Sequence, residues 1–436
     1  MSHGSYDKDL IGKNRRVVTN IYKENPYIFF ISNNLKIAKY FFRRNYTYII
    51  IQLYEKCYNK NIGIFVHIVE NYWCKMKLLF LFFLSLIIVN VSLSKKIKPD
   101  NADTYFKKGI ELLNNGNNEK AIELFQKAHK LKPEMLDYVY EIALAYYNMK
   151  DYEKAISILD TLRNHKDVND QVYQLLGNSY HFIENSDKAL EIYSEGLEKF
   201  PNSGRLYMEY GLALVGKKRV REVIGYWEKG IEVEPSYENN YYYLAKYFSR
   251  TGEKIWTLLY AEIYLNIAKN FKRRDEISKL LYETYNSGLF SPEDSLYKVS
   301  FSEVRIVSEN LDEKRIPFQL AFQNTMIEST KPYALMKTTS LPVKEIIKIR
   351  EQFIKIWFGK NYSDIFPNIV FDFQKKFLDS GYFDAYNYWL FDVADKKEFE
   401  NWQNQNMKKF KSFLRELVKS PLKLDKNNTL LRSQYE

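Results

Sequence analysis

The feature that most limits the fold of this chain is a repeat with a constant period. Five segments align without gaps, and they start at Ala102, Leu136, Asp170, Gly204 and Glu238. The first half of each segment carries a small residue at one place, and these residues are Gly109, Ala143, Gly177, Gly211 and Ala245. Large apolar residues stand four places before it and three places after it. The period is 34 residues, and a period of this length indicates stacked copies of one small structural unit.

The second half of the segments has a pattern of its own. Three segments share an alanine, at Ala121, Ala155 and Ala189. Four places later, four segments carry a large residue, which is Phe125, Leu159, Tyr193 or Trp227. Proline closes three segments, at Pro133, Pro201 and Pro235. Polar turn sequences, such as NNGNN at 114–118 and ENSD at 184–187, separate the two halves.

This period and this order of large, small and proline positions resemble the tetratricopeptide repeat (TPR). The resemblance implies an all-α solenoid in which each unit is two antiparallel helices. Small residues let the helices approach, large residues fill the space between them, and proline ends the second helix. Unit 5 departs from the pattern, with Thr257 in place of alanine, as expected of a terminal unit. We predict a solenoid over 102–288, closed by a capping helix from Lys272 that ends at Gly288 as its C′ residue.

The remaining third is predicted to be a mainly helical domain over 289–421, with one or two short strands. The segment 299–307 alternates partly with period 2 and is the candidate strand. Helices are expected after Pro342, over 369–391 with a break at Gly381, and from an Asp395 cap to residue 420. The polar tail, 422–436, is expected to be frayed. Aromatic residues crowd 357–402, and their helical spacing favours a core over a stacking surface for ligands.

Ahead of the repeats lies a sequence with the parts of a secretory signal. Lys75 and Lys77 precede an apolar run over 78–89, and Ser92 and Ser94 supply small side chains for cleavage near Ser94–Lys95. The alternative is a membrane anchor, which needs about 20 apolar residues. We interpret 76–94 as a cleaved signal and 95–101 as a linker, so the protein is expected to be periplasmic or secreted. The alternative location is membrane-anchored.

Residues 1–75 need a separate account, because a secretory signal works from the start of a chain. We interpret them as an extension from a misassigned start, with Met76 as the true start. The alternative is a cytosolic tail on an anchored protein. The signal, the repeats and GYFDAYNYWLF at 381–391 together resemble a group of exported Gram-negative TPR proteins, which adds a compartment and no chemistry.

Charge and cysteine content exclude several classes of partner and site. Residues 1–94 hold 13 Lys and Arg against 5 Asp and Glu, so 95–436 hold 52 basic against 49 acidic residues. This near balance argues against nucleic acid as a partner. Both cysteines, Cys57 and Cys74, precede the repeats, so 95–436 can form no disulfide and no cysteine metal site.

Catalytic signatures are missing from the chain, and from Lys272 onward it has neither His nor Cys. We therefore predict no enzyme, cofactor or metal site. The alternative is an envelope enzyme whose carboxylates, among them Asp372, Asp379 and Asp384, lie in the C-terminal domain.

The resemblance implies that first helices of successive units line a concave groove. Some TPR co-chaperones hold a carboxylate there with Lys and Asn, but Phe106 and Ile110 occupy those places here. The predicted groove is apolar at one end and polar to basic at the other, which suits a protein or peptide partner with an acidic portion. The expected groove residues are Phe106, Ile110, Tyr140, Leu144, Tyr147, Gln174, Asn178, His181, Arg205, Met208, Leu212, Asn239, Tyr242, Lys246 and Arg250. The leading hypothesis is an exported binding scaffold, and a third hypothesis is the same scaffold held in a membrane by 76–94.

Overall fold

A computed structural model of the chain describes residues 101–269, 271–290, 298–303, 316–335, 338 and 340–435. The predicted extension and signal, 1–94, lie outside these residues. Residues 100–436 form one compact unit. The described residues fold into helices and turns without a strand, so the all-α prediction is confirmed.

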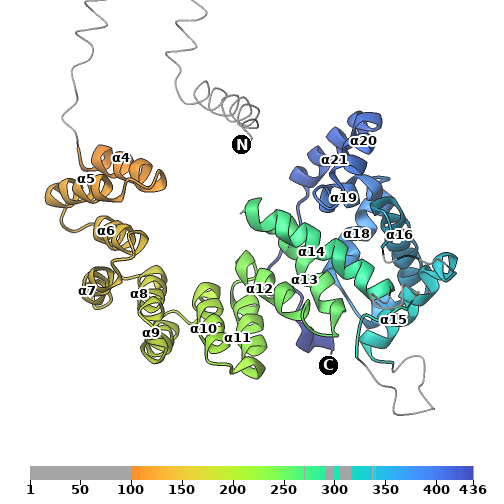
Figure 1. The fold of residues 1–436 in the computed structure, drawn as a ribbon, viewed down its shortest axis with the longest axis horizontal. Coiled ribbons are helices and arrows are strands. Elements are labelled where there is room, and N and C mark those ends of the chain that lie inside the picture. The colour runs from red at the N-terminus through yellow and green to blue at the C-terminus, as the bar shows by residue number, and fades with distance from the viewer. Residues whose placement is uncertain are drawn as a thin grey trace, which may run out of the picture. The chain divides into compact units, whose positions relative to one another are not determined.

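Five helix pairs follow one another along the chain (Figure 1), and their first helices begin at the five residues where the sequence repeat begins. Units 1 and 2 are α4 (Ala102–Asn114) with α5 (Asn118–Leu131) and α6 (Leu136–Asn148) with α7 (Tyr152–Leu162). Units 3 and 4 are α8 (Asp170–Phe182) with α9 (Ser186–Lys199) and α10 (Gly204–Gly216) with α11 (Val220–Val233). Unit 5 is α12 (Glu238–Phe248) with α13 (Lys254–Ile267).

The small residues lie where the two helices of a pair touch. A Cβ added to Gly177 would stand 2.2 Å from the ring of Tyr193, and one added to Gly211 would stand 2.3 Å from the ring of Trp227. Real Cβ atoms do not approach so closely, so a side chain at these places would push the helices apart. Each glycine and its ring come from the two halves of the same repeat, as the resemblance implies.

The turn within the pair is also repeated. The residue at the same place in units 1 to 4 has a left-handed backbone, and these residues are Gly116 (φ 78°), Lys150 (φ 64°), Glu184 (φ 62°) and Lys218 (φ 59°). Only the first is the glycine that this conformation favours. Local turn geometry is therefore held by the helix pair even where the residue type disfavours it.

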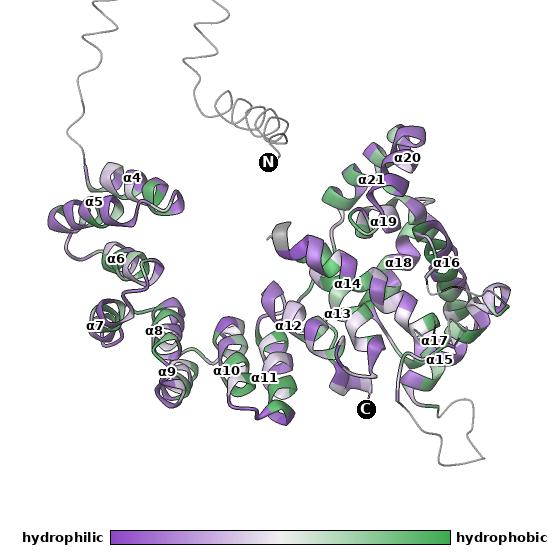
Figure 2. Cartoon of the chain, in the orientation of Figure 1, coloured by the Kyte–Doolittle hydropathy of each residue, from purple (hydrophilic) through white to green (hydrophobic). Residues whose placement is uncertain are grey.

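The C-terminal helices, from α14 onward, gather beside α13 instead of continuing the row of pairs (Figure 1). They are α14 (Phe271–Leu289), α15 (Phe318–Ser329), the short η2 (Lys331–Tyr333), α16 (Val343–Gly359), α17 (Tyr362–Ile365), α18 (Ile369–Asp379), α19 (Phe383–Leu390), α20 (Lys396–Gln405), α21 (Met407–Lys419) and η3 (Arg432–Tyr435). Most of these helices carry both hydrophobic and hydrophilic residues (Figure 2). One cluster of buried side chains runs from Ala143 in unit 2 to Leu430. The predicted domain boundary at 288 stays a prediction.

In the C-terminal third, two predictions made from the sequence are confirmed and two are wrong. Gly381 separates α18 from α19 with φ +75°, and the Asp395 carboxylate caps α20 at Glu398 N (2.9 Å). The helix expected from Asp395 to 420 is interrupted at Asn406 between α20 and α21. The assignment of Gly288 as C′ is wrong, because it lies inside α14, where an added Cβ would meet the ring of Phe301 at 2.4 Å.

The candidate strand and the frayed tail are also corrected. The candidate strand is 299–307. Its described part, 299–303, is not a strand, and the rest lies outside the described residues. The Phe301 carbonyl instead accepts from Ile255 N (3.1 Å), so the segment covers the start of α13. The tail packs tightly, because Leu430 is fully buried and the Tyr435 ring lies 4.3 Å from that of Phe318. The polar composition of the tail gave no indication of these contacts in the sequence.

Candidate functional site

The first helices of units 1 to 5 form one continuous surface, because α4 contacts α6, α6 contacts α8, α8 contacts α10 and α10 contacts α12. We call it the first-helix surface. Fourteen of the predicted groove residues lie on these helices, and Arg250 follows α12. Met208 and Tyr242 are buried, while His181 and Arg250 are exposed. The others are partly buried, namely Phe106, Ile110, Tyr140, Leu144, Tyr147, Gln174, Asn178, Arg205, Leu212, Asn239 and Lys246.

Three predicted residues converge on a carboxylate that the prediction omitted. Gln174 Nε2 donates to Glu209 Oε1 (2.6 Å), and Asn178 Nδ2 donates to the same oxygen (3.3 Å). Arg205 Nη1 in turn donates to Gln174 Oε1 (3.2 Å). Burial raises the pKa of Glu209, while the bonds from Gln174 and Asn178 and the charge of Arg205 oppose that rise. These four residues, the Glu209 cluster, place polar groups from α8 and α10 side by side.

The repeat itself contained a signal for Glu209. Glu141 occupies the same place two units earlier, on α6. It is partly buried, and no hydrogen bond or ion pair is found for it among the described residues. Burial, and then repulsion from Asp137, raise the pKa of Glu141 to about 7. The first-helix surface therefore carries a partly buried carboxylate with no hydrogen bond or ion pair among the described residues.

The helix α14 adds charged residues to the end of the surface at unit 5. Glu276 of α14 pairs with Lys246 and accepts from Tyr242 OH (2.7 Å). Arg273, also of α14, donates to Asn239 Oδ1 (2.7 Å) and lies 4.7 Å above the ring of Tyr242. The helix α14 thus brings one carboxylate and one guanidinium to this end of the surface, so the charge balance predicted there is unchanged.

An aromatic patch lies where units 2 and 3 meet. The Phe182 side chain is 54% exposed and stacks on Tyr152, with ring centroids 5.1 Å apart and planes 9° apart. Tyr147 meets Phe182 edge-on at 5.7 Å, and the His181 ring lies 6.0 Å from it. The prediction contained Tyr147 and His181 but not Phe182 or Tyr152. We define these four residues as the aromatic patch.

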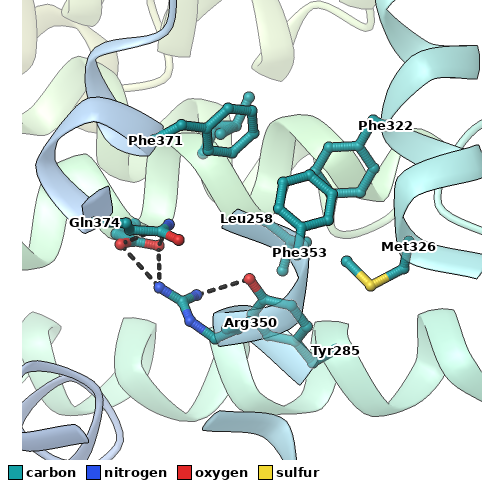
Figure 3. Close-up of a pocket in the computed structure, with 10 residues that line it drawn as sticks. Leu258, Tyr285, Phe322, Met326, Arg350, Phe353, Phe371 and Gln374 are labelled. Carbon is teal, nitrogen blue, oxygen red and sulfur yellow. Dashed lines mark hydrogen bonds and ion pairs between the residues drawn. The ribbon is translucent and has the colours of Figure 1, made fainter. Parts of the chain in front are cut away.

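A second candidate site lies inside the C-terminal helices (Figure 3). Arg350 Nη2 binds both Glu262 oxygens (2.9 and 2.8 Å), and Arg350 Nη1 donates to Tyr285 OH (2.7 Å). Gln374 Nε2 lies 3.0 Å from each Glu262 oxygen, and Tyr386 OH donates to Glu262 Oε1 (2.8 Å). Burial alone would lower the pKa of Arg350, but Glu262 and Tyr285 raise it above its usual range.

This buried network is a structural centre and not a substrate site. The space beside it is about 10 Å³, which is room for one water molecule at most. Phe322, Phe353 and Phe371 line its other sides (Figure 3). Glu262 is 2% exposed and Arg350 1%. The network joins α13 of unit 5 to α14, α16, α18 and α19.

Two of the three carboxylates of the enzymatic alternative form ion pairs with lysines. Asp379 pairs with Lys375 (2.5 Å) and Asp384 with Lys409 (2.6 Å). Asp372 lies at the exposed surface of α18, and partial desolvation of its carboxyl raises its pKa. Among the described residues no group of three or more His, Cys, Asp or Glu could hold a metal ion. No helix in the described part of the chain is both long and apolar enough to span a membrane.

Comparison with protein families identifies part of the repeat region. Models described as tetratricopeptide repeat match residues 112–178 and 170–202. Residues 112–202 of this chain therefore carry tetratricopeptide repeats. The matched residues run from the end of α4 in unit 1 to the end of unit 3, so they include the aromatic patch.

Several solved structures are similar to part of the chain. TTC0263, a thermophilic TPR protein of Thermus thermophilus, is 17% identical, with 41% of this chain and 98% of that chain covered and a TM-score of 0.37. MamA from Desulfovibrio magneticus RS-1 is 20% identical, with 38% and 93% covered and a TM-score of 0.29. YrrB, described as a TPR protein with an unusual peptide-binding site, is 15% identical, with 42% and 94% covered and a TM-score of 0.28. No curated protein matches the chain.

Proposed function

We propose that this TPR protein is a non-enzymatic scaffold that binds a protein or peptide partner on the first-helix surface of units 2 to 4. The observation that carries the proposal is the aromatic patch, where the Phe182 ring is 54% exposed although it is stacked on Tyr152. Large rings that are held rigidly at a surface bury much apolar area on binding at a low entropy cost. The patch adjoins predicted contact residues on α6 and α8.

The charges of this surface suggest the chemistry of the partner. Of the cations predicted in the groove, Lys246 is paired with Glu276, whereas Arg205 is bonded to the neutral Gln174 and keeps its charge. The Glu141 carboxylate is half-buried without a partner among the described residues, and its pKa is raised to about 7. A cation beside it would restore the charged form and lower that pKa. We therefore propose a partner segment with a large apolar side chain for the patch and a Lys or Arg for Glu141.

Selection of displayed random peptides against the immobilised full chain tests this proposal. Peptides that bind the intact protein should bind the Phe182→Ala, Tyr147→Ala variant at least tenfold more weakly, because two of the largest apolar contacts are removed. The matched control is Leu131→Ala, since Leu131 on α5 is 55% exposed and lies away from the surface. If the selected peptides bind the double variant and the intact protein equally, the site is wrong.

The same selection tests the cation. Selected peptides should be enriched in Lys and Arg, and Glu141→Gln should weaken their binding without changing the circular dichroism spectrum. Enrichment in Asp and Glu, with binding unaffected by Glu141→Gln, would favour the acidic partner that the sequence predicted.

We also propose that the protein is exported, on the strength of the basic, apolar and small-residue parts of 75–94. N-terminal sequencing of the protein from its own cells should then find Lys95 or a residue within a few of it. Recovery of intact protein that still carries 76–94 in a membrane fraction would support the anchored alternative instead.

A further inference from the structure

The outward face of α21 carries a stripe of basic side chains. Phe410 and Phe413 are buried on the inward face of α21, which packs against α19. On the other face Lys408, Lys411, Arg415 and Lys419 are all exposed, at spacings of three, four and four residues. Such spacings place side chains in one row along a helix. None of the four forms an ion pair among the described residues. We call this row the basic stripe.

The basic stripe is part of a concentration of positive charge. Residues 396–426 hold nine Lys and Arg against four Asp and Glu. Residues 95–436 as a whole hold only three more basic than acidic residues. This short segment therefore contains more than the entire positive excess of that part of the chain, and the remainder is slightly acidic. The asymmetry directs the α20–α21 face toward an anionic partner.

Apolar and concave features accompany the stripe. Val418 is 81% exposed and Met407 is 38% exposed, at opposite ends of α21. An open hollow of about 430 Å³ lies at the start of the stripe, lined by Tyr382, Gln405, Asn406, Lys408, Lys409 and Ser412. The Lys409 ammonium is already paired with Asp384 (2.6 Å), which leaves Lys408 as the available cation of the hollow.

We propose that the exposed face of α21 binds the surface of an anionic phospholipid membrane. The basic stripe lies against lipid phosphates, one headgroup occupies the hollow beside Lys408, and Val418 enters the boundary between headgroups and acyl chains. An aliphatic side chain that is exposed at the end of a cationic row fits an interface with an apolar layer beneath it. A polyanion such as a nucleic acid offers no such layer. This site is separate from the first-helix surface and does not rest on the function proposed for it.

Co-sedimentation of the full chain with vesicles tests the proposal. Binding is expected to vesicles that contain phosphatidylglycerol and not to vesicles of phosphatidylcholine alone, and it should fall as salt is raised because exposed charges are screened. The variant Lys408→Glu, Lys411→Glu, Arg415→Glu, Lys419→Glu should lose at least tenfold in affinity. Since all four side chains are exposed and unpaired among the described residues, its thermal unfolding should stay close to that of the intact protein. No binding to phosphatidylglycerol vesicles overturns the proposal.

A matched control carries the same change of charge elsewhere. Lys107, Lys120 and Lys130 are exposed on unit 1, and Lys166 is exposed in the loop after unit 2. The quadruple Glu variant of these residues should bind vesicles like the intact protein. Equal losses of vesicle binding in the two quadruple variants would show that binding depends on the net charge of the protein and not on the basic stripe. Val418→Ser should weaken vesicle binding and leave binding to heparin unchanged. Equal weakening of both, or of neither, overturns the insertion of Val418 into a membrane.

Discussion

The second helices of unit 1 and unit 5 occupy the same place in the repeat but have different surroundings. Both α5 and α13 are 14 residues long, yet four residues of α5 and eleven of α13 are buried. The helix α5 contacts α4 and α6, whereas α13 contacts α12, α14 and α18. The same repeat pattern thus produces an outer helix at one end of the solenoid and the central helix of a bundle at the other.

One repeat position shows how this difference arises. Glu228 of α11 and Glu262 of α13 are separated by one repeat period, so they hold the same place in units 4 and 5. Glu228 Oε1 accepts from Tyr260 OH (2.8 Å) and from Arg432 N of the tail (2.7 Å). Glu262 accepts from the C-terminal helices, as described above. In units 1 and 3 this place holds Gln126 and Ser194, both exposed. Buried carboxylates at one repeat position therefore anchor the C-terminal third to the repeats.

The largest expected effect comes from breaking the anchor in unit 5. Glu262→Ala leaves Arg350 buried without its counter-charge, which should lower the free energy of unfolding by about 3–5 kcal/mol. Urea denaturation of intact protein and variant measures this loss. The matched change in unit 3 is Glu191→Ala, which breaks an exposed pair with Lys188 and should cost less than about 1 kcal/mol.

Removing both charges sharpens the same comparison. The double variant Glu262→Met, Arg350→Met leaves no uncompensated charge, so it should recover part of the stability that Glu262→Ala loses. If Glu262→Ala costs no more than Glu191→Ala, α13 is as exposed as α5 and the contrast between the two ends is wrong.

The next effect concerns the tail. Leu430 is fully buried, so Leu430→Ala should cost about 2–5 kcal/mol through lost burial and the cavity that remains. The matched control is Leu335→Ala, because Leu335 is 97% exposed and its truncation should stay within about 0.5 kcal/mol. Thermal or urea unfolding of both variants decides between a packed and a frayed tail. Equal unfolding curves for Leu430→Ala and Leu335→Ala would support the prediction that the tail is frayed.

A smaller loss is expected inside the repeats. Gly177→Trp must push α8 from α9, because even a Cβ would stand 2.2 Å from the Tyr193 ring, and overpacking should cost about 1–3 kcal/mol or more. Glu191→Trp, on the exposed side of α9, should be nearly silent in thermal unfolding. An unchanged melting temperature for Gly177→Trp would mean that the helices of unit 3 do not meet at this residue.

The smallest effect tests the repeated turn. Lys218 has φ 59°, so Lys218→Gly should stabilise unit 4 by about 1 kcal/mol, because glycine adopts this conformation without steric cost. The converse change in unit 1, Gly116→Ala, should destabilise by a similar amount. Nothing lies within 4 Å of a Cβ added there, so its cost would come from the backbone alone. Opposite shifts in unfolding temperature are expected, and shifts of the same sign would contradict the shared turn.

The sequence predicted most about the repeats, because their contacts are local. All five first helices begin at the aligned residues, and Gly177 meets Tyr193 from the other half of its own repeat. These partners are at most one repeat apart, so the period of the pattern is enough to place them. In the C-terminal third the same reasoning located Gly381 and the Asp395 cap, which are also local signals.

The tertiary structure alone decided the polar contacts that join distant segments. Arg350 lies 88 residues from Glu262 in sequence, and Arg432 lies 204 residues from Glu228. Glu276, which pairs with Lys246 of the predicted groove, belongs to α14, outside the repeats. No periodicity or propensity relates such residues, since their pairing follows from how completed helices pack. The sequence by itself therefore determined the repeating unit, and only packing decided which of its polar side chains are buried as anchors and which remain free to bind a partner.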